Sequence, residues 1–228
     1  MKISALIPVK GFRNAKQRLS PLLGAADREL LAEAMFRDVL REVTRARGLD
    51  ATFVVTGNDR VAEIAMAMGA AVIREPAETG ETDAVDFARL ELKRAGREAV
   101  LILPGDMPLM HASDIEQVLA QMPDGAMEPF ALLVPSHDRL GTNALLLAPP
   151  DVIKLRFGYD SFSYHMSQVS ALGLPLRFFE NEAIGLDIDE PEDLRRFLAI
   201  GRDEGETYPL ARQLMTAAES RTRRLGGA

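Results

Sequence analysis

Three aspartates that follow predicted strands are the side chains best placed to do chemistry in this sequence. Asp106 comes after the apolar run VLIL and a Pro-Gly pair, and such a short run is typical of a strand buried on both faces. Asp187 and Asp189 lie two apart in the extended segment LDID, a spacing that puts both carboxylates on one face. Clustered carboxylates repel one another unless a cation lies between them, and Mg²⁺ or Mn²⁺ prefers such oxygen ligands. The three acids therefore indicate a divalent metal site.

Two of these acids also have plainer interpretations. Asp106 could be a turn aspartate that bonds its own backbone. Asp189 could supply negative charge to the N-terminus of the helix that Pro191 begins, since proline favours the first helical position. Asp187 has no comparable structural role.

A basic loop follows the first apolar run of the chain, residues 3–9. It places Lys10, Lys16 and Arg18 within nine residues of the end of that predicted strand. Cations there suit a polyphosphate, and arginine can bind phosphate oxygens with two hydrogen bonds, although a solvated basic loop is the simpler alternative. Acids and bases together favour phosphoryl or nucleotidyl transfer, in which positioning and charge neutralisation supply most of the catalysis.

Competing kinds of site find little support. The chain has no cysteine, which excludes disulfides, thiolate metal sites and cysteine nucleophiles. His111, His137 and His165 share no spacing, so a zinc site is not indicated. The Walker loop, the G-x-S-x-G elbow and the G-x-G-x-x-G fingerprint do not occur.

Strand and helix patterns alternate along the first half of the chain. Helices end at glycines and strands at Gly, Pro or Asn, an alternation typical of a mostly parallel α/β sheet. In such a sheet the ligand crevice lies beyond the carboxyl ends of the strands, where Lys10 and Asp106 are predicted. The expected strands are 3–9, 51–56, 70–74 and 100–103, and the expected helices are 27–47, 61–68 and 84–95.

The second half predicts a mixed sheet. Ser113 is expected to cap a helix, with Glu116 at capping-box spacing. Strands 130–135 and 144–148 should form a hairpin, which makes part of the sheet antiparallel. We further expect a helix over 161–172, a strand over 176–179 and a helix from Pro191.

Composition limits the classes of partner. The chain has 228 residues, 47% of them hydrophobic, and a net charge of −7, which argues against non-specific nucleic-acid binding. Its N-terminus has no cleavage signature and no apolar run reaches membrane-spanning length, so we expect a cytoplasmic protein. We predict one domain over 1–228, in which 201–228 is a helical extension that packs on a partner, with a homodimer as the expected assembly.

Several short motifs occur in a specific order: IPVK and AKQRLSP, then LPGDMP, GTNALLL, FGYDSF followed by a histidine, and LDIDEPEDL. Together they resemble the 2-phospho-L-lactate guanylyltransferase family, which includes phosphoenolpyruvate and 3-phosphoglycerate guanylyltransferases and serves coenzyme F420 biosynthesis. The resemblance covers about residues 1–200. It implies a Rossmann-like nucleotidyltransferase fold of the nucleotide-diphospho-sugar transferase type, with a mixed, mostly parallel sheet.

The resemblance also implies a reaction and a set of residues. The phosphate of a small phosphorylated carboxylic acid would attack the α-phosphorus of GTP and expel pyrophosphate. The implied residues are Asp106, Asp187 and Asp189 for catalysis and two Mg²⁺ ions, Lys10, Lys16, Arg18, Gly80 and Asp83 for the nucleotide, and Thr142, Gly158 and Ser161 for the acceptor.

One segment departs from the family pattern. Where the family usually has Gly-Leu-Asn before a helix, this chain has Gly80-Glu81-Thr82-Asp83. Carboxylates beside a triphosphate add repulsion, so we predict that Glu81 or Asp83 reads guanine or ribose instead of phosphate. Glu190 likewise fills a helix-cap position for which Ser, Thr or Asp is better suited.

Two other functions stay open. A nucleotidyltransferase of the same fold could use another base or acceptor, as the molybdenum-cofactor and sugar-phosphate types do, but their Gly-rich phosphate loop is missing and only Gly11 is available. A non-catalytic nucleotide-binding protein would not need the intact set of three acids and three bases.

Overall fold

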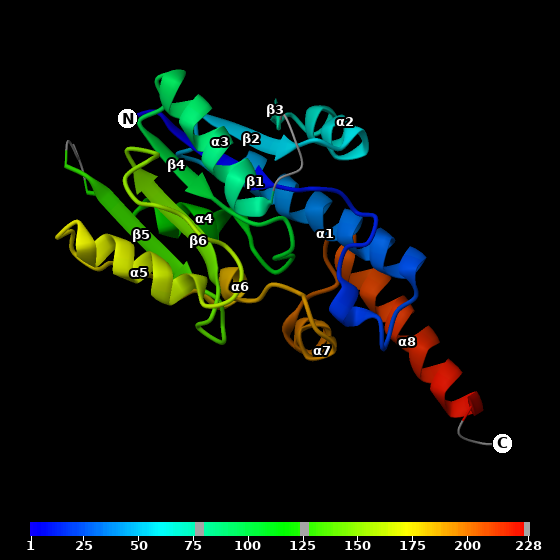
Figure 1. The fold of residues 1–228 in the computed structure, drawn as a ribbon. Helices are drawn as coiled ribbons and strands as arrows, with labels where there is room; N and C mark the ends of the chain where they lie inside the picture. Colours follow the sequence, from blue (N-terminus) through cyan, green and yellow to red (C-terminus); the bar gives the residue numbers. More distant parts are fainter. Residues whose placement is uncertain (76–79, 124–127, 226–228) are drawn as a thin grey trace.

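The fold is built on a six-stranded sheet with strand order β3-β2-β1-β4-β6-β5 (Figure 1). The computed structural model describes residues 1–75, 80–123 and 128–225. Residues 76–79, between the expected strand 70–74 and the expected helix 84–95, and the last three residues of the predicted extension therefore lie outside the described residues. The strands are β1 (Ile3–Pro8), β2 (Ala51–Thr56), β3 (Ala71–Arg74), β4 (Ala99–Ile102), β5 (Phe130–Pro135) and β6 (Thr142–Ala148).

Strand directions confirm the mixed, mostly parallel sheet. The strand β1 runs parallel to both β2 and β4, and β2 runs parallel to β3. The hairpin of β5 and β6 adds two antiparallel pairings, one within the hairpin and one between β6 and β4. The chain crosses from β1 to neighbours on either side, so a topological switch point lies between β1 and β4.

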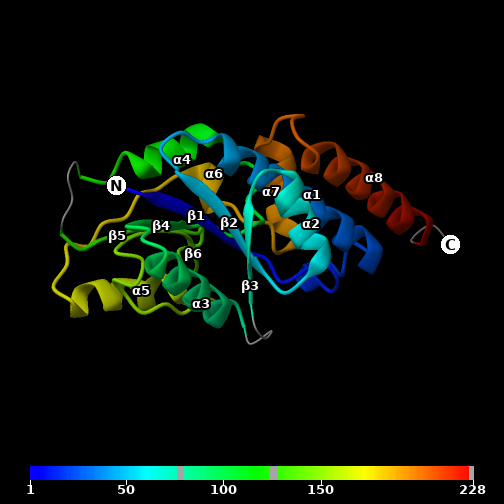
Figure 2. The same ribbon diagram turned by 90° about the horizontal axis from the view of Figure 1, so that it is seen from above.

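Helices cover both faces of the sheet (Figure 2). Alternate residues of β4 explain why, since Leu101 packs into the core on one face while Val100 and Ile102 pack on the other. The first face carries α1 (Ala25–Arg45), α2 (Asp59–Ala67), α4 (Ala112–Leu119), α6 (Glu182–Gly185), α7 (Pro191–Ile200) and α8 (Thr207–Leu225), and the second carries α3 (Glu81–Arg94) and α5 (Ser161–Ala171).

Three local predictions are wrong. The helix α3 begins at Glu81 and not near Ala84, so the acidic segment forms its first turn. The N-cap of α4 is His111, whose N–H donates to the Asp114 carboxylate, and not Ser113. The segment 176–179 forms only an isolated bridge from Phe178 to β5 and no strand.

The C-terminal helix α8 packs against α1 of its own chain. Its apolar side chains Ala211, Leu214 and Met215 are buried in the core beside α1, and packing of this extension on a partner stays a prediction. The buried carboxylate of Asp38 on α1 accepts hydrogen bonds from the N–H groups of Glu206 and Thr207 at the start of α8. None of the described helices is long and apolar enough to cross a membrane.

Candidate functional site

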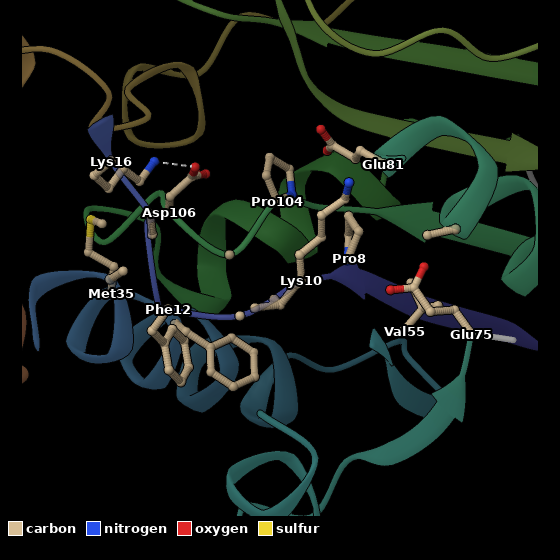
Figure 3. Close-up of a pocket in the computed structure, with 17 residues that line it drawn as sticks. Pro8, Lys10, Phe12, Lys16, Met35, Val55, Glu75, Glu81, Pro104 and Asp106 are labelled. Carbon is tan, nitrogen blue, oxygen red and sulfur yellow. Dashed lines mark hydrogen bonds and ion pairs between the residues drawn. The ribbon is translucent and has the colours of Figure 1, made fainter. Parts of the chain in front are cut away.

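The candidate site lies beyond the carboxyl ends of β1 and β4, at the switch point of the sheet. A cavity of about 410 Å³, here the first cavity, opens there (Figure 3), within the usual size range of small-molecule sites. Its walls come from the segments that follow β1, β3 and β4, from α1 and from the first turn of α3. They include Lys10, Phe12, Lys16, Phe36, Val55, Glu75, Glu81, Pro104 and Asp106.

Lys16 joins two of the predicted acids. It stands before the short 3₁₀ turn Gln17–Leu19 in a left-handed conformation, with φ of 53°. Its Nζ lies 2.5 Å from Asp106 Oδ2 and 2.7 Å from Asp189 Oδ1. Burial alone would lower the pKa of Lys16, but the two carboxylates outweigh that effect and raise it, so the ammonium stays charged at the centre of the acids.

A backbone contact brings the third acid into the same cleft. The Ile188 N–H donates to the Asp106 carbonyl oxygen at 3.1 Å. Ile188 is buried in the core, so its neighbours Asp187 and Asp189 face the cleft, as their spacing predicted. Asn143 Nδ2 donates to Asp187 Oδ1 at 3.0 Å, and burial together with the charge of Asp106 raises the pKa of Asp187 to about 6.

The acids suit a hard cation by their chemistry. Asp106 Oδ1 is buried, and among the described residues it has no hydrogen-bond partner, which leaves a lone pair available to an incoming ligand. Over those same residues, however, no three acids or histidines are arranged as a ligand cluster, and the Lys16 ammonium contacts oxygens of both Asp106 and Asp189. The donor types therefore fit a divalent cation, while the described arrangement satisfies two of the acids with a lysine.

A second cavity of about 380 Å³ adjoins the first. Both cavities are lined by Asp106, Pro104 and Glu81, so they meet at the acid that follows β4. The second cavity brings together all three residues predicted for the acceptor, and it also contains the other two acids. Its lining includes Thr142, Gly158, Ser161, Arg18, His137, Asn143, Asp187 and Asp189.

Two hydroxyl groups of the second cavity are oriented by their neighbours. The Thr142 N–H donates to Ser161 Oγ at 3.0 Å, and the Arg156 N–H donates to His165 Nε2 at 3.2 Å. Burial, with the charges of Arg156 and Arg89, lowers the pKa of His165 to about 4, so the ring is neutral and carries its proton on Nδ1. That Nδ1–H then donates to Thr142 Oγ1, 3.0 Å away.

The consequence is a pair of donors. The oxygens of Thr142 and Ser161 already accept hydrogen bonds from the protein, so their own hydroxyl hydrogens are available for an anion in the cavity. His165 was missed as a functional residue by the sequence analysis. Its signal was its place four residues after Ser161, a spacing that puts both side chains on one face of α5.

The other residues predicted for the nucleotide do not all line the same cavity. Lys10 lines the first cavity, whereas Arg18 is 70% exposed and lines the second, with Nη1 3.9 Å from Asp189 and 3.6 Å from Glu190. Gly80 and the exposed Asp83 do not appear among the described lining residues of either cavity. The structure thus separates them from the other residues predicted for the nucleotide.

Glu81 lies where the two cavities meet. Part of its surface is accessible to solvent, but protein atoms of the cleft surround its carboxyl group and reduce the hydration of the charged form. This desolvation, reinforced by the charge of Asp106, raises the pKa of Glu81 to about 7. The next residue, Thr82, accepts a hydrogen bond from the Phe157 N–H at 3.0 Å. The first turn of α3 is thereby tied to the loop that contains Gly158.

Comparisons with known proteins agree with this geometry. The family described as "Guanylyl transferase CofC like" matches residues 3–225. A phosphoenolpyruvate guanylyltransferase from Conexibacter woesei is 36% identical over 194 residues, 85% of this chain and 86% of that protein. A 2-phospho-L-lactate guanylyltransferase from Methanothermobacter thermautotrophicus is 32% identical over 228 residues, 97% of this chain and 95% of that protein.

Among solved structures, one from Desulfovibrio desulfuricans G20, named for nucleotide-diphospho-sugar transferases, superposes with a TM-score of 0.77. The superposition covers 96% of this chain and 98% of that chain, at 17% identity. At this identity the likeness is evidence for the fold alone. The nucleotidyltransferase fold predicted from the sequence is confirmed.

Proposed function

This chain belongs to the family described as guanylyl transferase CofC like, and we propose that it transfers GMP from GTP to the phosphate of a small phosphorylated carboxylic acid. Phosphoenolpyruvate, 2-phospho-L-lactate and 3-phosphoglycerate are the candidate acceptors. The observation that carries the proposal is the meeting of two cavities at Asp106, since a transfer reaction needs two substrates in contact at one point. The product would serve the pathway that the resemblance implies, coenzyme F420 biosynthesis.

The residues divide between the two substrates. Lys10 and Lys16 would meet the phosphates of GTP in the first cavity, while Thr142 and Ser161 would donate to the acceptor in the second. An oxygen of the acceptor phosphate forms a bond to the α-phosphorus, the bond from the α-phosphorus to the bridging oxygen breaks, and its electron pair leaves with pyrophosphate. No general base is needed, because the attacking phosphate is already ionised.

Magnesium belongs to this proposal. Asp106, Asp187 and Asp189 would hold it, and the unpartnered Oδ1 of Asp106 supports that assignment. When bound, the metal supplies charge neutralisation, which matters because two unit charges about 4 Å apart interact by roughly 4 kcal/mol at an effective dielectric of 20. Lys16, which contacts two of these acids, links the set to the phosphates.

The function is tested by a substrate matrix. Each of the four nucleoside triphosphates is combined with each of the three candidate acids, and pyrophosphate release is measured. We expect release with GTP and one preferred acid, and the preferred acid identifies the acceptor. Release with another nucleotide alone would favour a different nucleotidyltransferase, and tight GTP binding without any release would favour a non-catalytic nucleotide-binding protein.

The metal is tested by binding as well as by activity. Asp106→Asn should abolish turnover and weaken Mn²⁺ binding, measured by calorimetry on the chelator-treated protein, because the variant loses one anionic ligand. Glu219→Gln removes an acid from the exposed side of α8 and serves as the control. If Asp106→Asn bound Mn²⁺ as tightly as the parent protein, Asp106 would not be a ligand.

A further inference from the structure

A buried carboxylate, that of Glu75, lines the first cavity. Glu75 directly follows β3 and is only 9% exposed. Its Oε2 is buried and, among the described residues, accepts no hydrogen bond; within the same residues no cation lies at ion-pair distance. Figure 3 shows its carboxyl group turned toward the cavity, on the side where Lys10 enters.

An unpartnered buried carboxylate is costly. Desolvation of a polar group without a compensating hydrogen bond is unfavourable, and more so when the group is charged. A ligand that brings N–H donors to Glu75 would remove this cost. Sequence patterns do not single out Glu75, because its lack of a partner and its place in the cavity wall depend on its neighbours in the fold.

The rest of the cavity suggests which part of a ligand reaches Glu75. Figure 3 places the pair of Lys16 and Asp106 on the opposite side of Lys10 from Glu75. If the cations of Lys10 and Lys16 meet phosphates, the other end of the nucleotide extends toward Glu75. The wall there includes Val55, an apolar surface of the kind that a flat base packs against.

We propose that Glu75 reads the base of the nucleotide and selects guanine. Guanine alone among the four common bases presents two adjacent donors, N1–H and the 2-amino group, which the two oxygens of one carboxylate can accept together. Adenine and cytosine each place a ring acceptor beside their amine, and uracil flanks its N–H with carbonyls, so each leaves an oxygen of Glu75 unsatisfied or repelled. The inference rests on the proposed use of GTP and adds the residue that chooses it.

This assignment replaces the earlier prediction for the first turn of α3. Asp83 is outside the described lining of both cavities, and Glu81 lies beside Asp106 where the two cavities meet. Glu81 is therefore next to the expected reaction centre, whereas Glu75 is across Lys10 from it.

The unaltered protein provides the first test. We expect GTP to bind tightly, while inosine triphosphate, which lacks the 2-amino group, and N1-methyl-GTP, which lacks N1–H, each bind at least about 30-fold more weakly, because a site built to hydrogen-bond a group rejects an analogue without it. Equal affinity of GTP and both analogues, measured by calorimetry, would overturn the inference. Absence of any GTP binding or turnover would instead overturn the proposed function.

A variant gives the second test. In Glu75→Gln the side-chain amide can still accept from N1–H but now donates at the other position, where xanthine carries a carbonyl in place of the amine of guanine. The ratio of GTP to xanthosine triphosphate affinity should fall by about 100-fold. Glu63→Gln, the same change on the exposed face of α2, should leave that ratio unaltered.

A shorter acid completes the design. Glu75→Asp keeps the carboxylate but withdraws it by one methylene, so GTP affinity should fall without any gain for xanthosine triphosphate. Thermal unfolding of each variant checks that the fold is intact. An unchanged nucleotide ratio in a folded Glu75→Gln would show that Glu75 does not face the base, even if the enzyme remains a guanylyltransferase.

Discussion

Glu81 is one residue, together with Asp187, at which charge in the cleft can change near neutral pH. Its pKa is raised to about 7 chiefly by burial in the cleft wall and then by the negative charge of Asp106, with Lys10 opposing the shift. The ordinary value is 4.5. A group whose pKa is raised on folding holds its proton in the folded protein at a pH where the unfolded chain has lost it.

The sign of the effect on stability follows directly. Between pH 4.5 and about 7 the folded state binds the extra proton, so the contribution of Glu81 to stability falls as pH rises and its penalty is complete above that range. We therefore predict that Glu81→Gln raises the melting temperature at pH 8 relative to the parent protein, and that this gain disappears at pH 4. The measurement is a series of thermal melts in chelator across that range.

The same series on Glu63→Gln provides the control, because it neutralises an exposed acid that is not among the described lining residues of either cavity. A gain from Glu81→Gln that is equal at pH 4 and pH 8 would mean that packing, and not ionisation, distinguishes the variant.

At the scale of elements, α5 and β6 cooperate to shape the acceptor cavity. Ser161 begins α5 and Thr142 begins β6, and the Thr142 N–H bond to Ser161 Oγ holds the two ends together. His165, one turn further along α5, orients the Thr142 hydroxyl from behind. It acts through Thr142 and is a positioning residue.

His165→Phe should therefore raise the KM for the acceptor far more than the KM for GTP. Phenylalanine fills similar space but cannot donate to Thr142 Oγ1, so the hydroxyl is free to turn away from the cavity. His165→Asn, which retains a donor near the position of Nδ1, should recover part of the loss. Steady-state kinetics with each substrate varied in turn makes the comparison, and an equal rise in both KM values would indicate a general disturbance of the fold.

The strand ends were the predictable part of this fold. Apolar runs closed by glycine or proline identified β1, β2 and β4, and with them the positions of Lys10 and Asp106. The predicted start of α3 is three residues late, because a glycine followed by polar residues resembles a loop, although acids in a first turn are favoured by the helix dipole. The segment 176–179 was apolar enough for a strand, but it makes only one bridge and leaves Phe178 54% exposed.

The residues that line the acceptor cavity could be predicted from the sequence, whereas the roles of the residues that orient or complement them could not. Thr142, Gly158 and Ser161 meet in one cavity as the motifs implied. The roles of Glu75 and His165 depend on which groups surround them, because an orphan carboxylate and a neutral tautomer are properties of tertiary neighbours. The spacing of residues in the sequence shows neither the surroundings of Glu75 nor the tautomer of His165.

At the scale of the whole molecule, a buried carboxylate anchors the start of α8 to α1. Asp38 on α1 accepts hydrogen bonds from the Glu206 N–H at 2.9 Å, from the Thr207 N–H at 2.7 Å and from Arg41 Nη1 at 2.6 Å. Gly205, with φ of 72°, passes so close that a Cβ there would lie 2.6 Å from the Asp38 oxygens. The anchor thus needs both the acid and the glycine.

Asp38→Ala should destabilise the protein without weakening its site. Removing the acid leaves the buried Thr207 N–H and the partly buried Glu206 N–H unpaired, for a loss of about 3 kcal/mol. This corresponds to a fall of about 6–12 °C in melting temperature for a chain of this size. Gly205→Ala should act in the same direction through the clash with Asp38. Glu206→Ala, which removes an exposed ion-pair partner of Arg37 and Arg41, should cost much less. Urea unfolding measures the free energies, and calorimetry below the transition should find unchanged GTP affinity, since Asp38 lines neither cavity.

If Asp38→Ala weakened GTP binding as strongly as it weakened the fold, the anchor of α8 would be coupled to the cleft through α1, whose residues Met35 and Phe36 line the first cavity.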